Sequence, residues 1–285
     1  MEFTKMHGLG NDFIIVDNLN YRVPYEYFAR IAPLLCRRHF GIGADGLVIL
    51  DYHSKAALFT MRIFNPDGSE AEMCGNAIRC LARYIWEKGL NTNSTFSFLT
   101  RAGKKEISLT FSGNELRGVK VDMGEPVLDS KEIPVTGSQR RVVEEKISAE
   151  GEELYFTAVS MGNPHCVIFV PGVEEIPWQK WGPVLEESPV FPRKTNVEFV
   201  QVLNPREVKV KVWERGAGPT LACGTGACAV LAAGVITGRL ENKAKVKLPG
   251  GALQISWEED NRIFMEGPAE EVFVGKYKGE LPGYD

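Results

Sequence analysis

The feature that most constrains the fold of this chain is a five-residue motif that occurs twice. Met73-Cys74-Gly75-Asn76-Ala77 is followed 149 positions later by Ala222-Cys223-Gly224-Thr225-Gly226. Each copy opens a mostly apolar stretch that predicts a helix, so the chain places a cysteine at a helix start twice. The spacing is close to half of the 285 residues, which indicates two like segments.

Two further motif pairs recur at nearly the same spacing. Gly10-Asn11-Asp12-Phe13 corresponds to Gly162-Asn163-Pro164-His165 at an offset of 152, and Asp45-Gly46-Leu47 corresponds to Asn196-Val197-Glu198 at an offset of 151. Three pairs in one order at nearly constant spacing indicate an internal duplication. The duplication predicts a pseudo-twofold protein whose two repeated cysteines face one another across the junction of two domains.

The length and composition agree with a two-domain enzyme or binding protein. A chain of 285 residues is at the size where single cores divide, and its 44% hydrophobic and 25% charged content is ordinary for a globular protein. The strand pattern is interrupted near 122–126, so we expect domains over 1–122 and 123–269. The net charge of -4 gives no reason to expect a nucleic-acid partner.

The chain carries no signal for a membrane or for an oxidising compartment. No apolar run approaches the roughly 18 to 20 residues of a membrane span, and the first residues lack a signal-peptide pattern, so we expect a cytoplasmic protein with no membrane partner. Six cysteines in so long a chain do not form a secreted disulfide framework. Without a Cys-x-x-Cys pair or a histidine cluster, we expect no metal site.

Short β-rich runs outnumber helical patterns. The predicted strands are 3–7, 12–17, 47–51, 57–64, 95–100, 105–111, 115–122, 153–160, 165–170, 197–203, 207–213, 244–248, 252–257, 262–266 and 271–274, and the predicted helices are 24–38, 76–88, 178–187 and 225–237. This layout is α+β with mostly neighbouring strands. The stretch after Cys223 is apolar on nearly every face, which predicts a central helix surrounded by strands.

A cysteine at a helix start lies among backbone amides that have no partner within the helix. This setting is expected to lower the thiol pKa from about 8.5 toward neutrality, which makes a thiolate that can act as a base. The amides around Cys74-Gly75-Asn76 and Cys223-Gly224-Thr225 can bind a carboxylate. With one sulfur on each side of an α carbon, one thiolate would remove the proton while the other thiol supplied one from the opposite face, inverting the configuration. The other four cysteines, Cys36, Cys80, Cys166 and Cys228, are expected to be core residues.

The motifs around these cysteines resemble those of the diaminopimelate epimerase family. The run Asn65-Pro66-Asp67-Gly68-Ser69, four residues, then Cys74-Gly75-Asn76-Ala77-Ile78-Arg79 is similar to the family's signature. The resemblance extends from Met6-His7-Gly8-Leu9-Gly10-Asn11 to Ala222-Cys223-Gly224-Thr225-Gly226. It therefore covers nearly the whole chain.

The resemblance implies two like domains, each a mostly antiparallel β-barrel around a central helix, with the first completed by a C-terminal strand over 270–285. It also implies a cofactor-independent, PLP-independent amino-acid epimerase that interconverts LL- and meso-2,6-diaminopimelate for lysine and peptidoglycan synthesis. The two acid/base residues would be Cys74 and Cys223, supported by His165 and Glu214. The substrate contacts carry over to Asn11, Asn65, Gly75, Asn76, Asn163, Asn196, Glu214, Arg215, Gly224 and Thr225.

These residue types suit a substrate with two amino-acid ends. Arg215 can hold the distal carboxylate with a planar fork, and the asparagines offer both donors and acceptors. One departure from the family is Gly46, where some members carry a glutamine that contacts the substrate. The resemblance also implies a homodimer, with the family's aromatic dimer contact falling on Phe273. His7 and His39 have no such support and are expected to be structural.

Two other functions remain open from the sequence. One is a related two-thiol racemase, such as an enzyme acting on proline, although those enzymes typically carry histidine where Asn76 stands. The other is a redox-switched binding protein in which Cys74 and Cys223 form a disulfide. A disulfide requires sulfurs about 2.05 Å apart, so it could form only in an empty, collapsed cleft.

Overall fold

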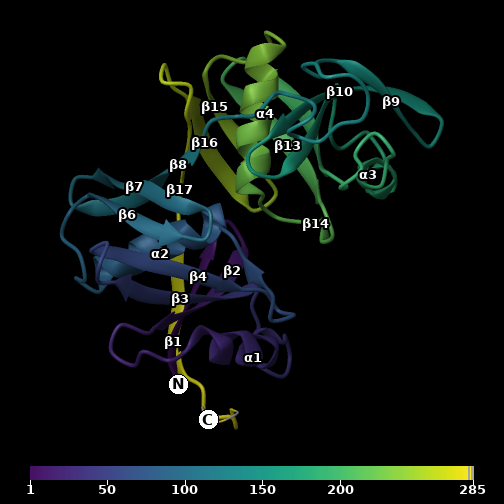
Figure 1. Cartoon of the computed structure of the whole chain (residues 1–285). Coiled ribbons are helices and arrows are strands. Elements are labelled where there is room, and N and C mark those ends of the chain that lie inside the picture. Colours follow the sequence, from purple (N-terminus) through teal and green to yellow (C-terminus); the bar gives the residue numbers. More distant parts are fainter. Residues whose placement is uncertain (282, 284–285) are drawn as a thin grey trace. The chain divides into compact units, whose positions relative to one another are not determined.

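The computed structural model describes residues 1–281 and 283 of the chain (Figure 1). They divide into two compact units, here called unit 1 (Met1–Val121 and Gly267–Asp285) and unit 2 (Asp122–Glu266). The C-terminal segment expected over 270–285 includes positions 282, 284 and 285, which lie outside the described residues. Among the described residues, no helix has the length and apolar content that a membrane crossing needs.

Unit 1 is a set of strands with two helices. Its elements are β1 (Glu2–Gly8), β2 (Asn11–Asp17), α1 (Tyr25–Cys36), β3 (Gly46–His53), β4 (Leu58–Phe64), β5 (Glu70–Ala71), α2 (Gly75–Glu87), β6 (Thr95–Thr100), β7 (Gly103–Ser112), β8 (Glu115–Gly124) and β18 (Glu270–Lys276). The late strand β18 pairs antiparallel with β1. The segment before it accepts hydrogen bonds from α2, from Arg79 Nε to Pro268 O at 3.2 Å and from Arg83 Nη1 to Ala269 O at 2.7 Å.

After its first strand, unit 2 repeats the order of elements that unit 1 shows before β18. It contains β9 (Glu145–Ala149), β10 (Glu152–Ser160), β11 (Pro164–Phe169), α3 (Trp178–Glu186), β12 (Asn196–Asn204), β13 (Glu207–Glu214), β14 (Gly218–Pro219), α4 (Gly224–Ile236), β15 (Lys243–Leu248), β16 (Gly251–Trp257) and β17 (Ile263–Gly267). The helices α1 and α3 therefore hold equivalent places, as do α2 and α4.

The strand pairings also repeat from one unit to the other. In unit 1, β2 runs parallel to β3, β3 antiparallel to β4, and β4 parallel to β6. In unit 2, β11 runs parallel to β12, β12 antiparallel to β13, and β13 parallel to β15. The register matches Phe13 with Gly46 and His165 with Asn196, so Gly46 and Asn196 hold equivalent places. The two copies suggested by the repeated motifs thus share one topology.

Helix α4 is buried on every side, as its sequence predicts. It packs against β10, β11, β12, β15 and β16, and Figure 1 shows it among the strands of unit 2. Ten of its residues, from Gly224 to Gly234, are buried. Since an apolar helix gains stability only when its whole surface leaves water, the strands of the unit have to surround it. Helix α2 lies against β1, β2, β3, β7 and β18 in the same way.

The expected fold class, α+β with mostly antiparallel strands around a central helix, is confirmed. All four expected helices are present, and each bound differs by two residues or fewer from the prediction. Strand β9 and the two-residue strands β5 and β14 were not expected. In β9 only Ile147 and Ala149 are buried, so this short charged segment carries too little apolar periodicity to be recognised.

The surrounded helix leads to a first prediction. Leu231 of α4 is fully buried, so Leu231→Ala should lower the free energy of unfolding by about 2 to 5 kcal/mol through lost apolar burial and the resulting cavity. Leu203→Ala, at a position of unit 2 that is 43% exposed, should cost about 0.5 kcal/mol or less. Urea-induced unfolding measures both. Equal losses for the two variants would contradict the central place of α4.

Candidate active site

Cys74 lies at the start of α2 beside two asparagines. It caps the helix in an extended conformation (φ -141°, ψ 119°), so its side chain lies at the helix end, where the first-turn amides have no partner within the helix. Its Sγ lies 3.8 Å from Asn11 Oδ1, to which Asn76 Nδ2 also donates at 3.0 Å. Gly75 is the first residue of the helix. The structure therefore brings together Asn11, Cys74, Gly75 and Asn76 as expected from the sequence.

The orientation of Asn11 is fixed by a charged cluster of Lys5, Asp12, Arg38 and Asp45. Asn11 Nδ2 donates to Asp45 Oδ2 at 2.8 Å, which turns the amide oxygen toward Cys74. Asp45 in turn accepts from Arg38 Nη2 at 2.7 Å, and the same nitrogen donates to Asp12 at 2.6 Å. Sequence reasoning gave no role to Asp45 or Arg38. The proximity of Asp45 to Gly46 in a repeated motif was the only available signal.

Asp12 is the acidic centre of this cluster. Burial alone would raise its pKa, but hydrogen bonds from Arg38 and Lys5 lower the pKa of Asp12 from 3.8 to about 2. The Lys5 ammonium lies 2.5 Å from the carboxylate. The carboxylate is therefore ionised across the physiological range and holds Arg38 in place.

Asn65 and Gly46 lie at the ends of the central strands of unit 1. Asn65 Nδ2 donates to Ser69 Oγ at 2.9 Å within the turn that leads to β5, so its side chain stabilises this turn. Gly46 is buried, and a Cβ there would lie 3.3 Å from Phe64 O and 3.5 Å from a carbon of the Phe13 ring. A Cβ at position 46 would therefore fit if the Phe64 carbonyl gave way by a few tenths of an ångström, while its distance to the Phe13 ring is an ordinary contact.

Cys223 occupies the corresponding place at the start of α4. The Gly226 amide donates to its Sγ at 3.3 Å, and Thr225 Oγ1 lies 3.5 Å from the same sulfur. Gly224 is the first residue of the helix, as Gly75 is in α2. Cys223 is only 6% exposed, so its sulfur is more enclosed than that of the half-buried Cys74.

The ionisation of Cys223 differs from the expectation for a helix start. Burial raises the pKa of the Cys223 thiol well above its ordinary value, and the carboxylates of Glu214 and Glu198 raise it further. The bonds from Thr225 and Gly226 lower it, but by less. The sequence argument counted the helix amides and left out both desolvation and the neighbouring carboxylates, which oppose them here.

Near Cys223, the side chains of Asn163, His165 and Glu198 form a hydrogen-bonded row, in which His165 and Glu198 are fully buried and Asn163 is half-buried. His165 is fully buried, with Nδ1 2.7 Å from Glu198 Oε1 and Nε2 3.0 Å from Asn163 Oδ1. Glu214 accepts from Thr220 Oγ1 at 2.5 Å. The structure thus brings Asn163, His165 and Glu214 into the surroundings of Cys223. Glu198 was missed, and the signal for it was a charged residue inside the buried run Val197–Val200.

A hydrogen bond joins the side chain of Asn196 to the backbone of Arg215. The Arg215 amide donates to Asn196 Oδ1 at 2.9 Å, while Asn196 Nδ2 donates to Pro164 O at 2.9 Å. The Arg215 guanidinium is exposed and donates from Nη1 to Arg193 O at 3.1 Å. The buried side-chain amide of Asn196 therefore fixes the backbone of Arg215. Most of the exposed Arg215 guanidinium is left able to bind a carboxylate.

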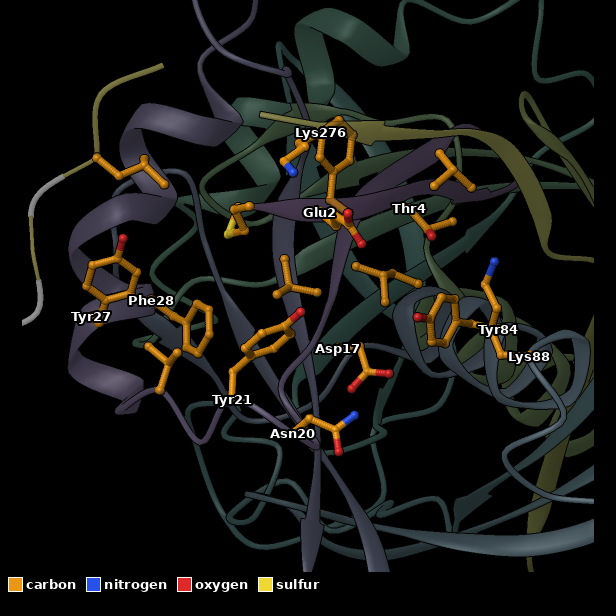
Figure 2. A pocket seen from close by; sticks show the side chains of 17 residues that line it. Glu2, Thr4, Asp17, Asn20, Tyr21, Tyr27, Phe28, Tyr84, Lys88 and Lys276 are labelled. Atoms are coloured by element: carbon orange, nitrogen blue, oxygen red, sulfur yellow. The ribbon is translucent and has the colours of Figure 1, made fainter. Parts of the chain in front are cut away.

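The four other cysteines, Cys36, Cys80, Cys166 and Cys228, are all buried, as expected for core residues. A cavity of about 610 Å³ in unit 1 contains none of the expected site residues. Figure 2 shows that Tyr27 and Phe28 of α1 line it on one side and Tyr84 and Lys88 of α2 on the other.

Comparison with known proteins decides the family. A family model described as diaminopimelate epimerase matches residues 3–128 and 157–272, which include both repeated cysteines. The chain belongs to the diaminopimelate epimerase family. It is 53% identical to a diaminopimelate epimerase of Pelotomaculum thermopropionicum over 97% of this chain and 99% of that protein. It is 52% identical to one of Methanococcus maripaludis, with the same coverage.

Solved structures outside this family share the fold at low identity. A hydroxyproline epimerase from Agrobacterium vitis matches with a TM-score of 0.70 at 13% identity, covering 96% of this chain and 91% of that one. A PhzF-family phenazine biosynthesis protein from Bacillus anthracis also gives a TM-score of 0.70, at 16% identity, covering 96% and 98%. At these identities the likeness shows the fold alone.

The cluster behind Asn11 leads to a prediction for stability. Because the pKa of Asp12 is lowered in the folded protein, its charge stabilises the fold above pH 4 and this contribution is lost as the pH falls toward 2. Asp12→Asn should lower the free energy of unfolding at pH 7 by on the order of 1 kcal/mol, allowing for solvent screening. Denaturant titrations at pH 7 and pH 3 should show a smaller difference at pH 3. The control Asp260→Asn, at an exposed site, should change the free energy of unfolding by less than about 0.5 kcal/mol. A loss for Asp12→Asn that does not depend on pH would refute a stabilising role for the Asp12 charge.

Proposed function

We propose that this chain is a diaminopimelate epimerase, an enzyme that interconverts LL- and meso-2,6-diaminopimelate without PLP or another cofactor. Family membership and 53% identity over nearly the full length of a curated relative support this. The observation that carries the proposal is that each of the two like units caps its buried helix with a cysteine. Such an enzyme supplies meso-diaminopimelate to lysine and peptidoglycan synthesis, which suits a cytoplasmic location.

The proposed reaction moves one proton off the α carbon and another onto it. The Cys74 thiolate removes the α proton, so the C–H bond breaks and an S–H bond forms. The electron pair left on carbon spreads into the substrate carboxylate, which the first-turn amides of α2 and α4 stabilise. The Cys223 thiol then donates its proton to the opposite face and becomes a thiolate. The reverse reaction exchanges the two roles.

This reaction requires each sulfur to lie about 3 to 3.5 Å from the α carbon, on opposite faces. We propose Asn11, Asn76 and Thr225 as the polar side chains that surround the reacting end. His165 and Glu214 would support proton transfer at Cys223. The distal end of the substrate would be held by Arg215, with Asn65, Asn163 and Asn196 supplying further donors and acceptors.

Deuterium exchange tests the activity and the role of the two cysteines together. In deuterated water under reducing conditions, the protein should deuterate and invert the α carbon of LL-diaminopimelate and leave proline unchanged. Cys74→Ala and Cys223→Ala should each lower the rate by about a thousandfold or more, because each removes one proton-transfer group. Mass spectrometry and chiral chromatography measure both changes.

The matched controls are Cys80→Ala and Cys228→Ala, which remove buried thiols from later turns of the same two helices. Both should keep most of the activity. Exchange into proline alone would favour the racemase, and no exchange into either amino acid would favour a binding protein. A near-normal rate in either Cys74→Ala or Cys223→Ala would refute the two-base assignment.

We also propose that the enzyme is a homodimer with β18 in the interface. Three consecutive apolar side chains of this strand are exposed, Val272 at 53%, Phe273 at 46% and Val274 at 57%. Phe273 packs edge-on against Phe3 with ring centroids 5.9 Å apart. A row of exposed apolar side chains on a paired strand is typical of a surface that a partner covers.

Light scattering tests the dimer. Phe273→Lys should shift the protein from dimer to monomer at micromolar concentration, because it places a charge in an apolar interface. The control Phe40→Lys makes the same change at a position that is 74% exposed in the same unit, and it should leave the mass unchanged. A monomeric unmodified protein would contradict the proposal.

A further inference from the structure

Glu198 is a charged side chain in the most buried part of unit 2. It lies in β12, whose first five residues are all buried, and it is itself fully buried. Its Oε1 is 2.7 Å from His165 Nδ1. Its Oε2 is also buried and, among the residues that the structure describes, has no hydrogen-bond partner. Such an arrangement is costly, since a buried carboxylate oxygen loses its water without replacement.

His165 cannot turn to supply the missing bond. Its second ring nitrogen, Nε2, lies 3.0 Å from Asn163 Oδ1, so the ring is held at both ends. An ionised Glu198 accepts its one hydrogen bond from the Nδ1 proton of His165. The carboxylate is therefore fixed in position, although only one of its two oxygens has a hydrogen-bond partner among the described residues.

The fixed carboxylate lies beside the sulfur of Cys223. Both groups pack against Gly226 in the first turn of α4, where a Cβ would lie 2.6 Å from Glu198 Oε1 and 3.2 Å from Cys223 Sγ. The oxygen and the sulfur are thus no more than about 6 Å apart, within the range where one charge alters the ionisation of another group. Only a glycine leaves room for this approach.

We propose that Glu198 is a positioning residue for Cys223: its carboxylate, held by His165 beside the sulfur, adds to burial and Glu214 in keeping Cys223 in the thiol form when no substrate is bound. The proposal rests on the two-cysteine mechanism above and deepens it. With Cys223 held as a thiol, Cys74 is the thiolate of the resting enzyme, and Cys223 is the first proton donor.

The other groups around Cys223 act in both directions. Burial raises the pKa of Cys223 most, followed by the charges of Glu214 from β13 and Glu198 from β12. On α4 itself, the Thr225 hydroxyl and the Gly226 amide favour the thiolate. Glu214 is half-buried and already accepts a bond from Thr220, whereas Glu198 is fully enclosed and has an oxygen without a partner among the described residues. Substitution of Glu198 therefore removes one enclosed carboxylate, whose hydrogen-bond partner among the described residues is His165.

The test is the pH dependence of Cys223 alkylation in the full chain. Iodoacetamide reacts with the thiolate, so peptide mass spectrometry of the Cys223 peptide gives the midpoint of thiol ionisation. In the unmodified protein this midpoint should lie above the ordinary value of about 8.5. Glu198→Gln should lower it by on the order of one unit, which is about a tenfold gain in alkylation rate below both midpoints.

The matched control is Glu145→Gln, which removes the same charge from unit 2 at a glutamate paired with Arg140. It should leave the Cys223 midpoint unchanged. A folded Glu198→Gln protein with the unmodified midpoint would overturn the proposal. If this variant does not fold, the Cys223 midpoint is measured in Glu198→Asp, which keeps the charge, and in the unmodified protein. A midpoint at or below about 8.5 in either protein overturns the proposal.

The alkylation test is independent of the proposed function. If Cys223→Ala retains epimerisation, the two-cysteine mechanism fails whatever the effect of Glu198. If Cys223→Ala is inactive but the Cys223 midpoint does not depend on Glu198, only the positioning role fails.

Discussion

The structure of unit 2 depends on one requirement, the removal of every face of α4 from water. Because the helix is apolar all round, strands pack against it along its length. As at every helix start, the backbone amides of its first turn have no partner within the helix. Those amides lie where the first residues of β11 and β12 meet the helix, which is why His165, Glu198 and Cys223 come together although they are far apart in sequence. Packing thus determines where the chemistry can be.

The two helix starts share a backbone arrangement and differ in charge. Cys74 has the neutral amides of Asn11 and Asn76 as neighbours, whereas Cys223 has the carboxylates of Glu198 and Glu214. The two units therefore supply two equivalent positions for sulfur, and their different side chains give the two sulfurs different electrostatic surroundings. In the proposed reaction, which needs one acid and one base at the same moment, such a difference assigns the two roles.

Much of the fold could be predicted from the sequence, because helix and strand periodicity and repeated motifs act over many residues. The helices, most strands, the α+β class and the enclosed α4 all follow from such patterns. The charge environment of Cys223 could not be predicted, since it depends on Glu198 from a strand whose alternation gives no sign that a glutamate points inward. Asp45 and Arg38 were missed because they lie in the loop between α1 and β3, where no periodicity shows which side chains meet: Asp45 binds Asn11, and Arg38 binds Asp45 and Asp12. The expected site residues come from short repeated motifs, which identify positions at the helix starts and strand ends but not the charges around them.

The return of β18 to unit 1 affects the order in which the protein is completed. During synthesis on the ribosome, the first 121 residues emerge before β18, which pairs with β1, has been made. The carbonyl groups that accept hydrogen bonds from Arg79 and Arg83 are also still missing at this stage. Residues 122–266 form unit 2 from one continuous stretch, which is translated in full before β18. The unit whose translation begins first therefore cannot complete its sheet until the other unit has been made.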